Sequence, residues 1–312
     1  MVADNEYLVV VNPNAGRKKG KKDWDKISSL LHRAGISFKA VFTEYPRHAI
    51  DISVTNIEKG YNKLIVVGGD GTMNEVVNGI FQQKRFPTSD ISLGMITVGT
   101  GNDWGRMFNI PLEYAEAIRT IKKNSAFVQD AGVVKYYNGE TEFSRYFINI
   151  AGIGFDALVC SKANKKKDQG KGGALSYLKS LIVSLMKYRS TRTMIYIDDR
   201  EIRNEVFNIS IGICKYNGGG MMQLPYAVAD DGLFDVTVIN KISKYDVILN
   251  LKRLYNGTIT RHPRVDAYKG KTIFIDSDPL IHLETDGESL GHSPFTFKII
   301  PRSIRVLTGE TA

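Results

Sequence analysis

The sequence predicts two domains: an α/β domain built around a parallel sheet, followed by a mostly antiparallel β-sandwich or barrel. Up to about residue 130, compact apolar runs alternate with segments of helical apolar spacing, which is typical of parallel strands covered on both faces. Beyond residue 130, short β-type runs separated by turn residues dominate. We therefore expect one domain over 1–130 and a second over 131–312, whose last segment could pack back on the first.

In the first domain, the apolar runs are predicted strands and the periodic segments are predicted helices. The predicted strands are Tyr7–Val11, Phe38–Phe42, Leu64–Val67 and Ile91–Val98. The predicted helices cover Trp24–Ala34, His48–Ile57, a segment from about Met73, and Leu112–Ile121.

In the second domain, β-branched and aromatic residues cluster in short runs bounded by turn residues. The predicted strands are Arg145–Ile150, Thr193–Ile197, Val206–Ile213, Phe234–Ile239, Thr272–Ile275, Ile281–Glu284, Phe295–Ile300 and Ile304–Leu307. Two helices are expected to interrupt them, over Leu175–Tyr188 and Tyr245–Tyr255.

Composition narrows the class of protein. The net charge of +9 fits a solvated basic surface, an anionic membrane surface or a phosphate-rich ligand, and no nucleic-acid-binding pattern accompanies it. Cys160 and Cys214 form neither a CxxC motif nor a Cys/His cluster, so a reducing, cytoplasmic location without structural zinc is expected. The N-terminus lacks the features of a signal peptide, and no apolar run approaches the roughly 18 residues of a membrane span.

The stretch VVGGDGTMNEVVNG, residues 66–79, places three glycines around one aspartate between a predicted strand and a predicted helix. Glycine permits positive φ angles and lets a ligand approach the main chain, whose N–H groups then bind anions at the helix N-terminus. Gly68, Gly69 and Gly71 suit a phosphate site, and a plain strand-to-helix turn is the alternative. Thr72 and Glu75 have the spacing of a capping box.

Asp70 is an unusual neighbour for a phosphate, because both groups are negatively charged. A divalent cation between them removes the conflict, and Mg²⁺ is usually bound by one or two carboxylates together with substrate phosphates. Asp70 therefore indicates a magnesium–nucleotide complex. The stretch is not a Walker loop, and Asn74 stands where the third glycine of GxGxxG belongs.

Two other predicted strands end in similar loops, residues 12–16 (NPNAG) and residues 99–103 (GTGND). The carboxyl ends of parallel strands lie at one edge of a sheet and form its ligand crevice. We therefore expect these two loops and the loop around Asp70 to lie side by side.

These motifs resemble those of the diacylglycerol kinase family of lipid kinases, particularly the soluble bacterial members, whose relatives include sphingosine and ceramide kinases. NAD kinases and phosphofructokinases have loops similar to GGDGT, whereas NEVVNG and GTGND favour a lipid kinase. The matching stretches are Asn12–Gly16, Thr43, Gly68–Gly79, Gly99–Asp103, Asp230–Gly232, His262–Val265 and Asp286–Glu288. The resemblance implies an α/β domain like that of NAD kinases and diacylglycerol kinases, a C-terminal β-sandwich, and ATP between them.

The resemblance also implies roles for individual residues. ATP contacts are expected from Asn12, Pro13, Asn14, Ala15, Gly16, Thr43, Gly69, Gly71, Thr72, Met73, Asn74, Glu75 and Thr100. Asp231 would hold Mg²⁺ with main-chain oxygens at Val228 and Leu233, since the side chain of Val228 cannot ligate. Asp70 and Glu288 would be catalytic, with Glu288 as the general base.

Phosphoryl transfer mainly requires that the reacting groups are aligned and that the charge on the phosphoryl group is neutralised. A carboxylate can take the proton of the acceptor hydroxyl. Glu288 follows a predicted strand, which would place it at a strand end, although Asp-Gly-Glu is also an ordinary hairpin turn. His262 is interpreted as part of a packing turn rather than as a base.

We expect an ATP-dependent lipid kinase acting on diacylglycerol. The alternatives are another lipid kinase (sphingoid base or ceramide), an NAD or sugar kinase, and a nucleotide-sensing or membrane-binding protein without turnover. The expected partner is a lipid at the membrane surface. The lysine-rich residues 162–171 and the following helix are candidates for peripheral contact with the membrane. The alternative is that they are a solvated loop and an ordinary core helix. The sequence is compatible with a homodimer but does not fix the oligomeric state.

Overall fold

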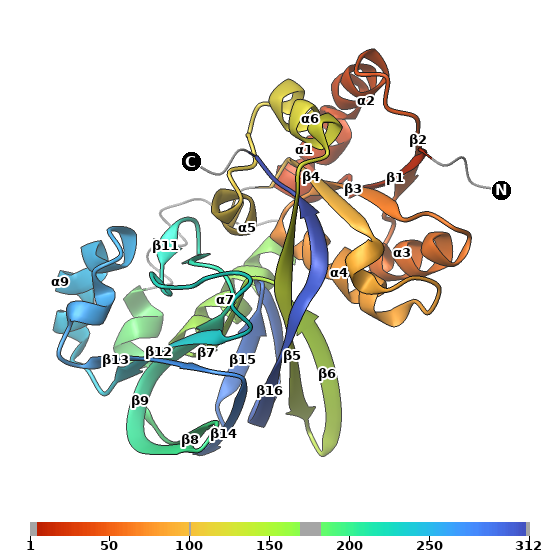
Figure 1. Cartoon of the computed structure of the whole chain (residues 1–312). Helices are drawn as coiled ribbons and strands as arrows, with labels where there is room; N and C mark the ends of the chain where they lie inside the picture. The colour runs from red at the N-terminus through yellow and green to blue at the C-terminus, as the bar shows by residue number, and fades with distance from the viewer. Residues whose placement is uncertain (1–4, 100, 169–181, 310–312) are drawn as a thin grey trace. The chain divides into compact units, whose positions relative to one another are not determined.

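The computed structural model describes residues 5–99, 101–168 and 182–309. The chain divides into two compact units (Figure 1). Unit 1 comprises residues 1–131 and 300–312, and unit 2 comprises residues 132–299. No helix of the described residues is both long and apolar enough to cross a membrane.

Unit 1 contains the predicted parallel sheet, and its strand order is β4-β3-β1-β2. The strands are β1 (Tyr7–Val11), β2 (Phe38–Phe42), β3 (Lys63–Gly68) and β4 (Ser92–Thr97). β1, β3 and β4 are almost wholly buried, which explains why each is a continuous apolar run in the sequence.

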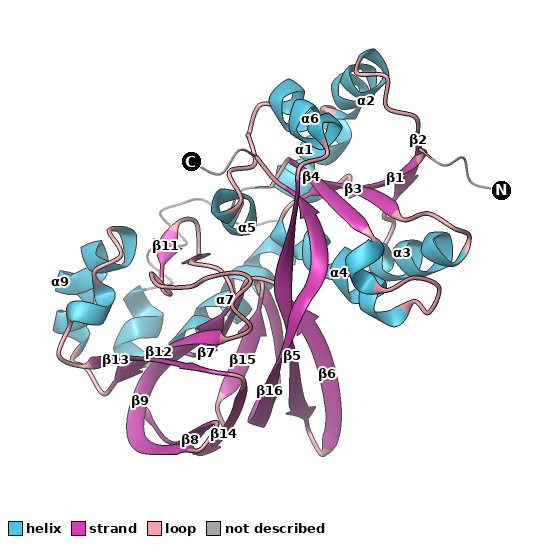
Figure 2. Ribbon diagram, viewed as in Figure 1, coloured by secondary structure: helices cyan, strands magenta, loops and turns pink. Residues whose placement is uncertain are grey.

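Helices flank this sheet (Figure 2). They are α1 (Ala15–Lys22), α2 (Trp24–Arg33), α3 (His48–Glu58), α4 (Asp70–Gln82), α5 (Asp103–Met107) and α6 (Tyr114–Lys123), with a 3₁₀ turn η1 (Thr88–Asp90). Ile27 and Leu31 of α2 and Ile118 of α6 join the strands in one buried core. The predicted helices are therefore confirmed, although α4 begins at Asp70 rather than near Met73.

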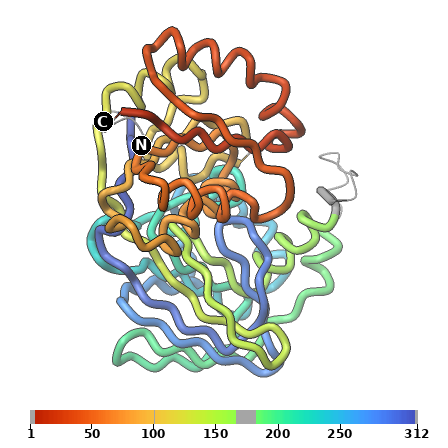
Figure 3. The backbone as a smooth tube through the Cα atoms, turned by 90° about the vertical axis from the view of Figure 1, so that its right-hand side faces the viewer, coloured from red at the N-terminus to blue at the C-terminus, as the bar shows by residue number. Residues whose placement is uncertain are grey.

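The end of the chain completes the sheet of unit 1. The last residues of β16 (Glu288–Leu307) pair in parallel with β4, Arg305 with Ser92 and Val306 with Leu93. Leu307 is fully buried in the core of unit 1. Figure 3 follows the chain end, in dark blue, back into the part of the molecule built from the first 131 residues. β4 therefore has a strand on each side.

Unit 2 is built from antiparallel strands that form a closed circuit of hydrogen-bonded neighbours, β9-β8-β14-β16-β15-β7 and back to β9. These are β7 (Ile150–Gly154), β8 (Thr191–Ile197), β9 (Arg200–Gly212), β14 (Thr272–Asp278), β15 (His282–Thr285) and part of β16. Phe147, Phe234, Phe295 and Phe297 form an aromatic core. The expected antiparallel β architecture is confirmed, with long strands shared by both faces.

Other elements border this circuit. They are β5 (Ala126–Asn138), β6 (Thr141–Phe147), β12 (Phe234–Asn240), β13 (Val265–Gly270), a short hairpin of β10 (Tyr216–Asn217) and β11 (Met221–Met222), α7 (Phe155–Asp168), α9 (Lys244–Tyr255) and a 3₁₀ turn η2 (Ile259–Arg261).

Three predictions for this region need comment. The expected strand Arg145–Ile150 is instead the end of β6 and the start of β7, separated by Ile148 and Asn149. β5 and β13 were not predicted. Most of the expected helix Leu175–Tyr188 lies outside the described residues, and its described part is helical over 182–187.

Candidate functional site

Three loops meet at the carboxyl edge of the sheet in unit 1. The side-chain amide of Asn12, after β1, donates a hydrogen bond to Oγ1 of Thr72 in α4 at 2.9 Å. The N–H of Thr43, after β2, donates to the carbonyl of Val11 at 2.9 Å. A Cβ on Gly99, after β4, would lie only 2.8 Å from Cα of Gly69. The expectation that the strand-end loops lie side by side is thus confirmed.

Gly16 shows why glycine is needed in the first of these loops. Its φ is +59°, and a Cβ there would lie 1.7 Å from the carbonyl oxygen of Val98 at the end of β4. Any side chain would both strain the backbone and separate the loops. Glycine at this position therefore lets the loop after β1 pack directly on the end of β4.

The N-terminus of α4 is arranged differently from the prediction. The N-cap is Gly69, and no side chain of the described residues caps it, so its first N–H groups are suited to an anion. The predicted capping box is wrong, because the carboxylate of Glu75 instead accepts the N–H groups of Arg47 and Ala49 at 3.1 and 3.2 Å. Glu75 thereby fixes the start of α3 beside α4.

Asp70 joins the loop after β3 to the loop after β4. Its carboxylate accepts the N–H of Trp104 at 3.2 Å and that of Asp103 at 3.4 Å, both in α5. Burial and the charge of Asp103 raise the pKa of Asp70, while these backbone N–H groups lower it. A Cβ on Gly101 would lie 3.0 Å from Asp70 Oδ2 and 3.6 Å from Asp103 Oδ2. Two carboxylates therefore flank one small space, an arrangement that fits Mg²⁺ shared with phosphates.

Four of the expected nucleotide contacts are buried: Thr43, Thr72, Met73 and Asn74. Met73 and Asn74 are almost fully buried, and Asn74 accepts a hydrogen bond from Asn78 through its carbonyl at 2.8 Å. Only the main chain of Met73 and Asn74 could contact a nucleotide. Thr100 lies outside the described residues.

In unit 2, Glu288 follows a tight turn between β15 and β16. Asp286 and Gly287 have φ angles of 49° and 85°, which is typical of a type I′ hairpin, and Thr285 pairs with Glu288. The buried carboxylate of Asp286 accepts the N–H groups of Ile148, Asn149 and Ile150, each at 3.1 Å. These bonds also account for the break between β6 and β7, and they anchor the turn far more firmly than an ordinary surface hairpin.

A second buried carboxylate lies beneath the same turn. Glu284 accepts the N–H of Gly287 at 2.9 Å and the amide of Asn217 at 3.1 Å. Burial, reinforced by the charge of Asp156, raises the pKa of Glu284 to about 8. Asp156 itself is bonded by Asn208 and by the Gln223 amide, each at 2.8 Å.

Glu288 differs from these buried neighbours. It is half-buried, and within the described residues of unit 2 its carboxylate makes no hydrogen bond or ion pair. Cys160 and Asn164 of α7 both donate to the carbonyl of Gly287, at 3.1 Å in each case, so the preceding turn is held from this side as well. Glu288 is thus an accessible carboxylate on a rigid support, as a general base requires.

The expected cation position at Asp231 is held by a lysine. Asp231 accepts the N–H of Leu233 at 3.1 Å and the ammonium of Lys269 at 2.8 Å. Nζ of Lys269 also lies 3.2 Å from the buried carboxylate of Asp235, opposite which it stands in the β12–β13 ladder. The ammonium thus supplies a positive charge beside Asp231, and the Mg²⁺ site at Val228, Asp231 and Leu233 stays a prediction. Among the described residues, no three acidic, His or Cys side chains gather to hold a metal.

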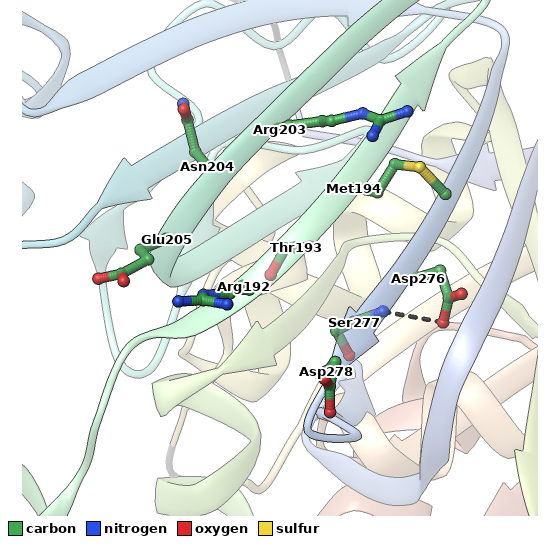
Figure 4. Close-up of a pocket in the computed structure, with 9 residues that line it drawn as sticks. All are labelled: Arg192, Thr193, Met194, Arg203, Asn204, Glu205, Asp276, Ser277 and Asp278. Carbon is green, nitrogen blue, oxygen red and sulfur yellow. Dashed lines mark hydrogen bonds between the residues drawn. The ribbon is translucent and has the colours of Figure 1, made fainter.

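A groove of roughly 560 Å³ lies elsewhere in unit 2, along β8, β9 and β14 (Figure 4). Its lining mixes two arginines, Arg192 and Arg203, with Glu205, Asp276 and Asp278. None of the predicted site residues lines it.

Comparisons with known proteins cover both units. The model of the diacylglycerol kinase catalytic domain matches residues 6–134, and that of the YegS C-terminal NAD kinase beta sandwich-like domain matches residues 149–308. A diacylglycerol kinase of Staphylococcus saprophyticus is 30% identical over 300 residues, covering 96% of this chain and 94% of the relative. The chain belongs to the diacylglycerol kinase family. A family member from Staphylococcus carnosus, also a diacylglycerol kinase, is 28% identical to this kinase over 300 residues.

Solved structures agree with this assignment. A candidate diacylglycerol kinase from Bacillus anthracis is similar to this kinase with a TM-score of 0.77 and 25% identity, covering 98% of this chain and 97% of the other. A yeast NADH kinase has a TM-score of 0.54 at 11% identity over 98% of this chain and 84% of its own, a likeness of fold alone. The predicted family and its two-part fold are therefore confirmed.

Sequence reasoning missed the residues that support Glu288. Asp286 was recognised only as part of a motif, and Glu284 only as the end of a strand. Asp156 lies in the stretch GIGFDA, residues 152–157, whose GxGxxA spacing resembles a dinucleotide motif and gives no signal of a buried acid. A Cβ on Gly152 would lie 2.6 Å from Oε1 of Glu284 and 2.8 Å from Cβ of Asp156, so this glycine makes room for both acids.

Proposed function

We propose that this kinase transfers the γ-phosphoryl group of ATP to the hydroxyl group of a lipid, with diacylglycerol as the first candidate acceptor. The observation that carries the proposal is the meeting of three glycine-containing loops at the sheet edge of unit 1, with Gly16 against Val98 and Gly69 against Gly99. Diacylglycerol is the first candidate acceptor because the Staphylococcus relatives are named diacylglycerol kinases. The reaction would take place at the cytoplasmic face of a membrane, as part of phospholipid metabolism.

The loops of unit 1 would bind the triphosphate through main-chain N–H groups, chiefly at the uncapped start of α4. Mg²⁺, when bound by Asp70 and Asp103, would neutralise charge on the phosphates. Asp70 would also hold the two loops together, because its carboxylate accepts N–H groups of α5. The same residue therefore has a structural and an electrostatic role.

Glu288 of unit 2 would accept the proton of the lipid hydroxyl. Its carboxylate is accessible, whereas Glu284 and Asp286 are buried and committed to main-chain N–H groups. General-base catalysis of this kind contributes about 10²- to 10⁴-fold to a rate. The turn fixes the base, so little of its freedom is lost when substrate binds.

The test is transfer of labelled phosphate from ATP in the presence of Mg²⁺ to a panel of acceptors: diacylglycerol, ceramide, a sphingoid base, NAD and a sugar. We expect labelled product with a lipid acceptor. In Glu288→Gln, kcat should fall about 10²- to 10⁴-fold while ATP affinity changes little. Transfer to NAD or the sugar alone would refute the proposal.

The matched control is Glu140→Gln. Glu140 is an exposed glutamate in the Gly139-Glu140 turn between β5 and β6, so the same chemical change is made at an ordinary hairpin. Its kcat should equal that of the unmodified protein. Equal activity of Glu288→Gln and Glu140→Gln would remove Glu288 from the mechanism.

A further inference from the structure

Helix α9 of unit 2 has its apolar side chains on the outside. Residues on the surface helix of a globular protein normally turn their apolar stripe toward the core. None of the residues of α9 is buried, and Tyr245 and Leu249 are 72% and 61% exposed. Of the fifteen large apolar side chains that are exposed in the described residues, five lie on this helix. They are Tyr245, Ile248, Leu249, Leu251 and Tyr255.

The opposite side of α9 carries Asp246, Asn250 and Arg253 together with the half-buried Val247 and Leu254. Asn250 donates to the carboxylate of Asp246 at 2.8 Å and accepts from Nε of Arg253 at 2.7 Å. Asp246 also lies 3.4 Å from Nε2 of the buried His262. The bonds of Asn250 lie within the helix, whereas the contact of Asp246 with His262 and the hydrogen bond from Lys244 to the carbonyl of Tyr188 join α9 to the rest of unit 2.

The exposed side forms one continuous face. With 100° between successive residues, the five apolar side chains fall within an arc of roughly 160° that also contains Lys244, Lys252 and Asn256. Tyr245 and Tyr255 stand near the two ends of the helix, with Ile248, Leu249 and Leu251 between them. Tyrosine rings with a polar tip favour a membrane–water interface, and aliphatic side chains favour the layer beneath it.

Cationic residues are frequent in α9 and in the segments that adjoin it in the sequence. Residues 241–264 contain six lysines and arginines and one acidic residue, Asp246. Lys252, Arg261 and Arg264 are exposed, and none of them pairs with a carboxylate in the part of the chain that the structure describes. A two-fold contact between copies of this chain would bring the same face together with itself, and thus bring these like charges together. An anionic bilayer surface complements them.

We propose that α9 is a membrane-docking helix that lies in the interface of an anionic bilayer, with its apolar face in the lipid and Lys252, Arg261 and Arg264 at the headgroups. The choice of a bilayer as the occupant rests on the proposed lipid kinase function, since the acceptor hydroxyl is then at a membrane surface. The docking helix is a different segment of the sequence from the lysine-rich residues 162–171.

The experiment is co-sedimentation with vesicles, without ATP. The full chain should sediment with vesicles of phosphatidylcholine and phosphatidylglycerol, bind vesicles of phosphatidylcholine alone more weakly, and dissociate at high salt. The double variant I248S/L249S should bind at least about tenfold more weakly, because two aliphatic side chains no longer enter the lipid. K252E/R261E should lose the preference for anionic vesicles while keeping the apolar face.

Leu280→Ser is the matched control, because Leu280 is 57% exposed in unit 2 but lies outside α9. It should bind as the unmodified chain does, and circular dichroism should show that all variants are folded. Equal binding by I248S/L249S and L280S would overturn the proposal. A dimer in light scattering that becomes a monomer in I248S/L249S would also overturn it, because the face would then bind a second copy.

Kinase assays separate this proposal from the proposed function. If the protein binds anionic vesicles but phosphorylates no lipid, the proposed kinase function is refuted and the docking helix is not. Phosphorylation of a short-chain, water-soluble acceptor by a protein that does not bind anionic vesicles would refute the docking helix alone.

Discussion

The ammonium group of Lys269 lies 2.8 Å from the carboxylate of Asp231, on the residue where the family resemblance implies a metal ion. The same ammonium lies 3.2 Å from Asp235. Burial lowers the pKa of Lys269, but its bonds to the two carboxylates raise the pKa on balance, so the lysine is charged. The ammonium group of Lys269 thus neutralises charge on two neighbouring carboxylates of unit 2, those of Asp231 and Asp235.

Replacing this lysine with an uncharged residue should therefore destabilise unit 2. In Lys269→Met, the buried carboxylate of Asp235 loses its partner, and we expect a loss of about 1–2 kcal/mol in the free energy of unfolding, measured with urea. Lys135→Met is the control, since Lys135 pairs with Glu142 in an exposed bridge worth less than about 1 kcal/mol. Added Mg²⁺ should stabilise Lys269→Met more than the unmodified chain, and equal effects would show that Mg²⁺ does not bind where the ammonium was removed.

The close approach of the strand-end loops gives a second prediction. In Gly16→Ala, the new methyl group would collide with the carbonyl of Val98, so the loop after β1 must move away from β4. We expect kcat/KM for ATP to fall about a hundredfold.

Gly35→Ala controls for backbone strain alone. Gly35 also has a positive φ, +72°, but nothing lies within 4 Å of a Cβ there. It should cost about 1–2 kcal/mol of stability and leave kcat/KM unchanged. If both alanine variants keep full activity, the contact between the loops does not shape the nucleotide site.

The buried carboxyl of Glu284 predicts a pH dependence of stability. Its pKa rises from 4.5 to about 8 in the folded protein, so the folded state holds a proton that the unfolded state has released. This contribution is complete below pH 4.5 and is lost as the pH rises toward 8. The loss is at most about 1.4 kcal/mol per pH unit for one proton.

Urea unfolding of Glu284→Gln at several pH values tests this. The variant should lose that slope between pH 5 and 8, because glutamine remains neutral, whereas Glu140→Gln should keep it. Parallel curves for Glu284→Gln and the unmodified chain would show that Glu284 titrates normally.

Unit 1 could be predicted from the sequence because three of its strands, β1, β3 and β4, are buried on both faces. Such strands are continuous apolar runs, and loops at their carboxyl ends must share one edge. The partners of Glu75 could not be predicted, since it accepts N–H groups of Arg47 and Ala49, which tertiary packing alone brings near. The local spacing of Thr72 and Glu75 predicted a capping box, but in the structure Glu75 bonds to the distant start of α3 instead.

Unit 2 was predicted in class but not in detail. β13 has the sequence VDAYKG and forms no apolar run, so the register that places Lys269 opposite Asp235 had no signal in the sequence. Similarly, the turn before Glu288 was recognisable from Asp-Gly, while the three N–H groups bound by Asp286 come from residues 136 to 138 positions away.

The pairing of Arg305 and Val306 with β4 has a consequence for biosynthesis. Almost the whole chain must be synthesised before β16 can pair with β4. The strands β1 to β4 of the same sheet are translated within the first third of the chain. A nascent polypeptide interrupted after residue 299 would present an open, apolar β-edge to other chains. Expression of such a fragment should yield aggregates, unless residues 300–309 are supplied as a separate peptide.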